Sequence, residues 1–147
     1  MKRCFFIGHK DAPENLVPRL AEVIEKLVTV HEVDEFIVGH YGRFDSQAAA
    51  AVIEMKRKYR HISLVMLLPY HPATRSIDLP EGFDTSVYPV ELDNVPKRMA
   101  IVRANRYMID HVDYLIAYAW HPASNTLNLL EYARKRERKN LLVITLL

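Results

Sequence analysis

Short apolar runs alternate along the chain with longer stretches in which apolar residues recur at helical spacing. The apolar runs predict buried strands over residues 4–7, 35–38, 63–68, 114–119 and 141–147. The helical spacing predicts helices over residues 13–28, 43–59, 96–111 and 125–136. Strands that are apolar along their length and alternate with amphipathic helices indicate a parallel sheet covered on both faces. The predicted fold class is α/β: a single Rossmann-like three-layer α/β/α domain over residues 1–147, with a mainly parallel sheet of about five strands.

Residues 69–96 interrupt this alternation. They contain prolines at positions 69, 72, 80, 89 and 96 and a turn at Gly82-Phe83-Asp84. Only residues 86–88 look extended. A loop of this length inside a compact domain is usually functional or mobile, but the sequence does not define its role.

Composition and charge exclude several classes of protein. A net charge of +2 over 147 residues is nearly balanced, so we expect no direct binding to nucleic acid or membranes. The densest basic stretch, residues 134–139, favours the negative end of a helix dipole, with a nucleic-acid patch as the alternative. No apolar stretch approaches the roughly 20 residues that span a bilayer, and the first apolar run is too short for a signal peptide. Cys4 is the single cysteine, which excludes an internal disulfide and predicts a buried thiol. The expected location is cytoplasmic.

Ligands of open parallel sheets bind outside the carboxyl ends of the strands, where helix N-termini present backbone N–H groups. At these positions the sequence has Gly8-His9-Lys10, the segment 39–45 and the segment 121–126. In the segment 39–45 a strand is followed by two glycines three residues apart and then by a helix. This pattern predicts a tight turn whose amides face an anion. Alternatively, Gly39 and Gly42 serve the turn alone, because a third glycine and a P-loop lysine are missing.

Several polar side chains near these ends have two interpretations. Ser124 or Asn125 caps the last long helix, or contacts a phosphate or ribose. Asp45 caps its own helix, or holds a ribose hydroxyl. The arginines of the helix over residues 96–111 are either solvated or include an anion clamp, and Arg103 is our candidate. The predicted ligand-binding residues are Gly8, His9, Lys10, Gly39, His40, Gly42, Arg43, Asp45, Arg103, His121, Ser124, Asn125 and Thr126.

Four histidines, at positions 9, 40, 71 and 121, each follow a different predicted strand. Together they could bind a borderline metal such as zinc. No carboxylate–histidine spacing supports a metal site, so we predict none. Each imidazole could instead hydrogen-bond to a ligand.

Five short motifs occur in an order that resembles a known superfamily. They are Gly8-His9-Lys10, Gly39-x-x-Gly42-x-Phe44-Asp45, residues 103–110, residues 113–118, and Thr126-x4-Glu131-Tyr132-Ala133. Together they resemble the YpsA-like branch of the SLOG superfamily, which also contains Smf/DprA and the LOG phosphoribohydrolases. The resemblance spans nearly the whole chain. It implies a Rossmann-like fold with a cleft for a nucleotide or a nucleotide-derived ligand, often in a sensing role.

The second glycine-rich site of the LOG enzymes, Pro-Gly-Gly-x-Gly-Thr-x-x-Glu, is only partly matched. Its glycines are missing from residues 122–126, and Leu129 occupies the position of the catalytic glutamate. Glu131 lies two residues further on, about half a turn around the helix. Asp45 and Glu131 are therefore the catalytic candidates of this chain, and transfer of the hydrolase chemistry is in doubt.

Three functions from different classes follow. The first is a binding or sensing domain for a small phosphorylated or nucleoside-derived ligand, with no required cofactor and no catalysis of its own. The second is an N-glycosidase, phosphoribohydrolase or deoxyribosyltransferase-like enzyme, in which Asp45 or Glu131 would stabilise or attack the sugar carbon. The third is an interaction module that uses a sheet edge or exposed aromatics (Tyr70, Tyr88 and Trp120) to bind another protein or a second copy of this chain. A homo-oligomer is therefore one of the alternatives.

Overall fold

A computed structural model describes residues 1–122 and 124–147. The strands are β1 (Lys2–Gly8), β2 (Val33–Val38), β3 (Ser63–Leu67), β4 (Thr85–Val87), β5 (Tyr114–Tyr118) and β6 (Val143–Leu146). The helices are α1 (Val17–Thr29), α2 (Arg43–Lys58), α3 (Ala100–His111) and α4 (Asn125–Arg138). Two 3₁₀ turns, η1 (Val90–Leu92) and η2 (Lys97–Met99), precede α3.

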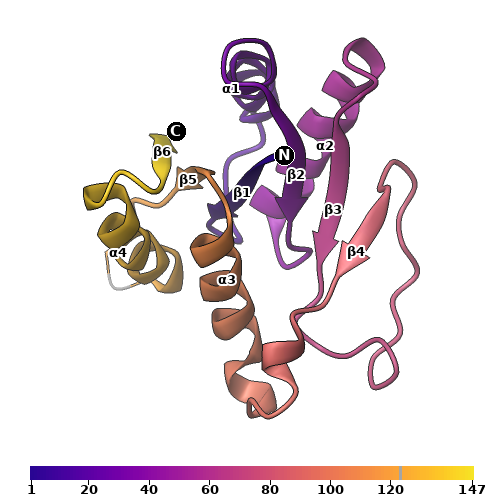
Figure 1. The fold of residues 1–147 in the computed structure, drawn as a ribbon, viewed down its shortest axis with the longest axis vertical. Helices are drawn as coiled ribbons and strands as arrows, with labels where there is room; N and C mark the ends of the chain where they lie inside the picture. Colours follow the sequence, from indigo (N-terminus) through magenta and orange to yellow (C-terminus); the bar gives the residue numbers. More distant parts are fainter. Residues whose placement is uncertain (123) are drawn as a thin grey trace.

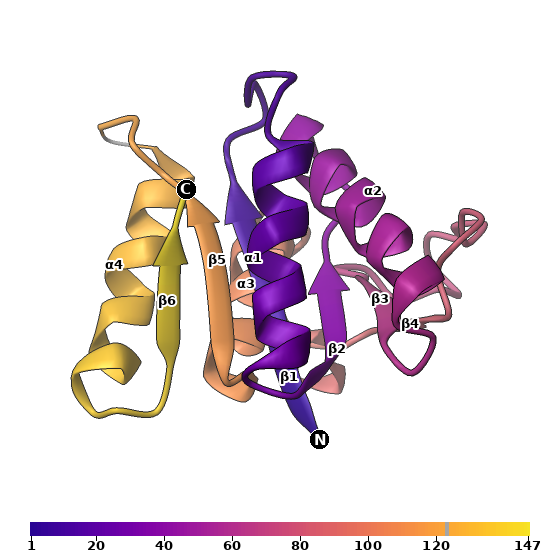
Figure 2. The same cartoon turned by 90° about the horizontal axis from the view of Figure 1, so that it is seen from above.

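The strands form one parallel sheet in the order β4-β3-β2-β1-β5-β6. Helices α1 and α2 cover one face and α3 and α4 cover the other (Figures 1 and 2). Neighbouring strand residues face opposite layers: Phe6 packs in the core with α1 and α2, while Phe5 packs in the core with α3 and α4. The predicted three-layer α/β/α fold is confirmed.

The sheet has one strand more than the sequence predicts. β4 pairs with β3, and its ends are fixed by hydrogen bonds from Asp84 N to Leu64 O (2.9 Å) and from Leu68 N to Val87 O (2.8 Å). It lies within the segment that we expected to be a loop. Its three residues are exposed or half-buried, so the strand shows no apolar run. Only pairing with β3 defines it.

Helix α1 begins at Val17 and not at Pro13. Pro18 explains this difference, because proline lacks the backbone N–H that the helix interior requires but is accepted in the first turn. A helix starting at Pro13 would place Pro18 beyond that turn. Residues 13–16 instead form part of the loop after β1, in which the Pro13 carbonyl accepts a hydrogen bond from Gln47.

The chain changes direction across the sheet at β1. From β1 it proceeds through β2, β3 and β4 to one edge, and after α3 it returns to place β5 on the other side of β1 (Figure 1). In open α/β sheets the crevice at such a reversal, at the carboxyl ends of the strands, is where ligands bind. No helix among the described residues has the length and apolar character needed to span a membrane. Cys4 is fully buried, as predicted.

Candidate functional site

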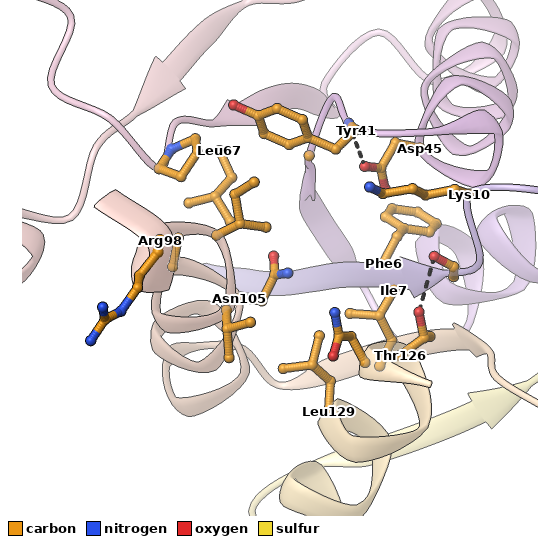
Figure 3. A pocket seen from close by; sticks show the side chains of 17 residues that line it. Phe6, Ile7, Lys10, Tyr41, Asp45, Leu67, Arg98, Asn105, Thr126 and Leu129 are labelled. Carbon is orange, nitrogen blue, oxygen red and sulfur yellow. Dashed lines mark hydrogen bonds between the residues drawn. The ribbon is translucent and has the colours of Figure 1, made fainter. Parts of the chain in front are cut away.

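A cavity of about 260 Å³ lies at the carboxyl ends of β1, β2 and β3, between α2, α3 and α4 (Figure 3). Its wall is largely apolar, and Figure 3 shows polar side chains that reach it from several elements. The apolar lining residues are Phe6, Ile7, Leu67, Pro69, Ile101, Val102, Ala104 and Leu129. The remaining lining residues are Gly8, Lys10, Gly39, Tyr41, Asp45, Arg98, Asn105, Asn125 and Thr126. Apolar surface combined with polar groups that converge from several elements is typical of small-molecule sites.

At the end of β1 the backbone approaches two helices closely. A Cβ atom on Gly8 would lie 2.1 Å from Cγ of Phe44, so only glycine fits there. The Gly8 carbonyl accepts a hydrogen bond from Thr126 Oγ1 at 3.3 Å, which joins β1 to the first turn of α4. Lys10 follows and is exposed at the cavity. We expected the segments after the strands over residues 4–7 and 114–119 to meet at one edge of the sheet, and the Gly8–Thr126 hydrogen bond places them there.

Asp45 closes the turn between β2 and α2. Its Oδ2 accepts a hydrogen bond from Tyr41 N at 2.9 Å. The same oxygen would lie 2.9 Å from a Cβ atom on Gly39, so the glycine makes room for the carboxylate. Burial raises the pKa of Asp45 to about 6, and the Tyr41 hydrogen bond opposes this rise. Asp45 therefore both holds the turn and presents a carboxyl group, partly protonated near pH 6, to the cavity.

Gly42 and Arg43 lie outside the cavity, which corrects our expectation that this turn faces a phosphate directly. Gly42 has a φ of +124°, and a Cβ atom on it would lie 2.8 Å from Cα of Lys10. Arg43 donates from its backbone N to Lys10 O (2.9 Å) and from Nη1 to Ala12 O (3.1 Å). The two residues thus hold the loop after β1 in place. For Gly42, the interpretation as a turn residue fits the structure better.

The histidines do not line the cavity, although we predicted His9, His40 and His121 as ligand contacts. His9 is buried, and its Nε2 accepts hydrogen bonds from Trp120 N (3.0 Å) and His121 N (3.2 Å). Burial lowers the pKa of His9, which favours the neutral ring that these bonds require. Burial also lowers the pKa of His40, whose ring lies 4.2 Å from that of Tyr41. His121 lies beside Asp11 at 3.8 Å.

The residues that we predicted as ligand contacts at the start of α4 have different roles in the structure. Ser124 Oγ accepts a hydrogen bond from Leu127 N at 3.1 Å, so Ser124 is the helix cap. Asn125 and Thr126 line the cavity. Leu129, which the resemblance aligns with the LOG glutamate, lines it too, whereas Glu131 is exposed and does not line it. This corrects our choice of Glu131 as a catalytic candidate. Ala123 lies outside the described residues.

Helix α3 turns Arg103 away from the cavity and presents other residues. Arg103 is exposed and is not among the lining residues, so our choice of anion clamp was wrong in position. Arg98 and Asn105 line the cavity instead. Figure 3 shows Asn105 pointing into it, with Arg98 at the outer end, away from Lys10. The sequence signal for Asn105 was its place as a polar residue on the apolar face of α3.

The exposed aromatics of the interaction hypothesis also differ from expectation. Trp120 is 60% exposed, but Tyr70 and Tyr88 are partly buried. Tyr88 donates a hydrogen bond to Asp93 Oδ1 at 2.7 Å. Within residues 1–122 and 124–147, no three histidine, cysteine or acidic side chains gather as metal ligands would.

Comparison with protein families gives no match for the chain. Its sequence is 29% identical over 140 residues to the uncharacterized SPbeta prophage-derived protein YoqJ of Bacillus subtilis, with coverage of 82% of this chain and 81% of YoqJ. Among solved structures, DNA processing protein A (DprA) from Streptococcus pneumoniae superposes with a TM-score of 0.67 at 14% identity. The match covers 93% of this chain and 48% of that DprA, so the chain spans about half of its length.

Two further structures have the same arrangement of elements. DprA from Helicobacter pylori, whose single-stranded DNA binding mode has been described, gives a TM-score of 0.56 at 14% identity, covering 97% of this chain and 64% of DprA. The molybdenum cofactor carrier protein of Chlamydomonas reinhardtii gives 0.55 at 13% identity, with coverage of 99% and 90%. The chain shares its Rossmann-like α/β fold with these three proteins. At these identities the likeness extends to the fold alone.

Proposed function

We propose that the protein binds a nucleotide or nucleoside-derived ligand in the cavity at the ends of β1–β3, without catalysis of its own. The observation that carries the proposal is the composition of this cavity. One largely apolar wall is combined with cations at separate points, Lys10 and Arg98, and with the carboxyl group of Asp45. A planar base suits the apolar wall, ribose hydroxyls suit Asp45, and a phosphate suits either cation.

The cavity volume limits the size of this ligand. About 260 Å³ lies just below the range of about 300–1,000 Å³ that is typical of ligand pockets. A single nucleoside or mononucleotide is therefore the proposed ligand, and a dinucleotide is too large. No cofactor is part of the proposal.

The comparisons support the proposal by analogy. DprA and the molybdenum cofactor carrier protein share the fold, and the latter is named for carrying the molybdenum cofactor. Membership of the SLOG superfamily, placement in its YpsA-like branch, a single-domain organisation and a cytoplasmic location belong to this proposal as well. The superfamily and branch rest on the motifs of residues 8–10, 39–45, 103–110, 113–118 and 126–133. The single domain rests on chain length and element order, and the location on the absence of a signal-peptide or membrane-spanning pattern in the sequence.

Titration calorimetry with nucleoside 5′-monophosphates tests the proposal. Arg98→Ala removes a cation of η2 that lines the cavity, whereas the matched control Arg103→Ala removes an exposed arginine of the following helix, α3, that does not line it. A charge-assisted hydrogen bond contributes about 1.5–3 kcal/mol, so we expect Arg98→Ala to weaken binding about 10- to 100-fold. Arg103→Ala should bind like the wild type. Absence of binding by every monophosphate would refute the proposal.

A second candidate function, N-glycosidase chemistry, is favoured by the position of Asp45. Its carboxyl group faces the cavity, and burial raises its pKa to about 6, as in the carboxylic acids that protonate the leaving group of a glycoside. Incubation with nucleoside monophosphates should then release free base, and Asp45→Asn should abolish the release. Binding without release would leave the sensing function alone.

A further inference from the structure

Asn105 holds an unusual position in helix α3. Asparagine is a poor helix former, because its side chain competes for backbone hydrogen bonds. Asn105 nevertheless lies in the middle of the helix, on the face that lines the cavity together with Ile101 and Val102. Figure 3 shows its amide directed into the cavity and opposite the ring of Tyr41.

The amide of Asn105 is half-buried, and it makes no hydrogen bond with another side chain or carbonyl group in the described parts of the chain. The amide atoms of Asn105 are not among the fully buried polar atoms that lack a partner, so water reaches the amide from the cavity, and a polar group of a ligand can replace that water. Leucine has nearly the same shape and would suit the neighbouring apolar residues better. The position therefore fits a side chain whose hydrogen-bonding partner is a ligand.

We infer that Asn105 recognises the edge of a nucleobase, an inference that rests on the nucleotide-binding function proposed above. A carboxamide presents one donor and one acceptor side by side. Its complement is a planar ring with an adjacent acceptor and donor, as adenine presents to asparagine in many complexes. The ligand class is thus a purine or pyrimidine with an amide-like or amidine-like edge, held between α3 and the ring of Tyr41.

The charged lining residues lie at the two ends of the cavity, so the part beside Asn105 is available to a base. Asp45 and Lys10 lie together near the ends of β1 and β2, and Arg98 lies at the opposite, outer end (Figure 3). Asn105 lies between them, next to the apolar side chains of Ile7 and Leu129. The charged ends suit the sugar and phosphate, and the central amide selects among bases.

Affinities for five probes test this role: the 5′-monophosphates of adenosine, guanosine, cytidine and uridine, and ribose 5-phosphate, which lacks a base. The wild type should prefer one nucleotide over the others and over ribose 5-phosphate by about 5- to 150-fold. Asn105→Leu should reduce this preference to less than about threefold and leave the affinity for ribose 5-phosphate unchanged. Asn105→Ala gives the same test with a smaller side chain, if leucine disturbs folding.

Asn128→Leu is the matched control, because Asn128 is an exposed asparagine of α4 that does not line the cavity. It should keep the preference of the wild type. The inference is overturned, with the proposed function intact, if Asn105→Leu keeps the order and ratios of the wild type, or if the wild type binds all four nucleotides equally. Failure of the wild type to bind any of the five probes would overturn both.

Discussion

At the scale of single residues, two opposing effects act on the carboxyl group of Asp45. Its carboxylate supports the β2–α2 turn through the Tyr41 hydrogen bond, yet its burial opposes the charged form. Because the folded state raises its pKa from the ordinary 3.8 to about 6, the folded state binds this proton more tightly than the unfolded state. The protonated Asp45 carboxyl group therefore contributes fully to the free energy of unfolding below about pH 4, and this contribution is lost as the pH rises through about 6.

We predict that Asp45→Asn is more stable than the wild type at pH 7. The amide keeps an acceptor oxygen for Tyr41 and does not ionise. The shift to about 6 corresponds to at most roughly 3 kcal/mol, so the gain should approach that value at pH 7 and vanish near pH 4. Urea unfolding between pH 4 and 8 measures it, with Asp78→Asn as a control on an exposed carboxylate. An equal gain at all pH values would contradict this explanation.

Individual side chains were the part of the site that the sequence predicted least well. The strand ends correctly indicated the loops that meet, and Lys10, Asp45 and Thr126 line the cavity as expected. His9 lies at the same strand end but faces the backbone of Trp120. Whether a loop residue faces the cavity or the neighbouring loop depends on contacts more than 100 residues away in the chain, and these contacts leave no local pattern.

At the scale of elements, the β2–α2 turn depends on the backbone conformation of Gly42. Its φ of +124° belongs to a region that residues with a side chain rarely adopt. The adjacent hydrogen bond from Arg43 N to Lys10 O joins this turn to the loop after β1. Two of the loops that border the cavity are thus held by one glycine.

We predict that Gly42→Ala destabilises the fold by roughly 1–3 kcal/mol, because it combines a strained φ with a contact of 2.8 Å to Lys10 Cα. It should weaken ligand binding only through the displaced Lys10 loop. Chemical denaturation measures the loss, and Glu54→Ala at an exposed position of α2, away from the turn, is the control. Unchanged stability with lost binding would instead place Gly42 at the ligand.

Periodicity predicted the elements well wherever burial alone defines them. The central strands are apolar on both faces and the helices have clear apolar faces, so β1, β3, α2 and α4 lie close to their expected bounds. Residues 86–88 looked extended, but they were not assigned to the sheet as β4, because this strand depends on pairing and not on burial. The start of α1 was predicted too early, although the sequence contained the decisive residue, Pro18.

At the scale of the whole molecule, the charge distribution bears on the DprA likeness. A Helicobacter pylori DprA binds single-stranded DNA, whereas this chain has a net charge of only +2. Strong binding to single strands requires a positively charged groove along the backbone of the nucleic acid. We therefore keep the expectation that the proposed ligand is a mononucleotide and not a nucleic acid.

Fluorescence anisotropy with a labelled oligothymidine measures this directly. We predict a dissociation constant weaker than about 10⁻⁴ M at physiological salt, the weak end of non-specific binding. Competition between the oligonucleotide and a bound mononucleotide should be absent. Micromolar affinity that falls steeply between 50 and 200 mM salt, two concentrations chosen to expose phosphate contacts, would instead reveal a nucleic-acid surface.

The central place of β1 also bears on the order in which the molecule is built. The sequence neighbour of β1 in the sheet is β2, but its other neighbour is β5, and Arg3 N donates a hydrogen bond to Asp113 Oδ2, 110 residues away. Until β5 has been made, one edge of β1 is exposed to mispairing. Such distant pairing slows folding. The nascent chain thus carries an open sheet edge through most of its translation, and its cavity is completed only when α4 emerges from the ribosome.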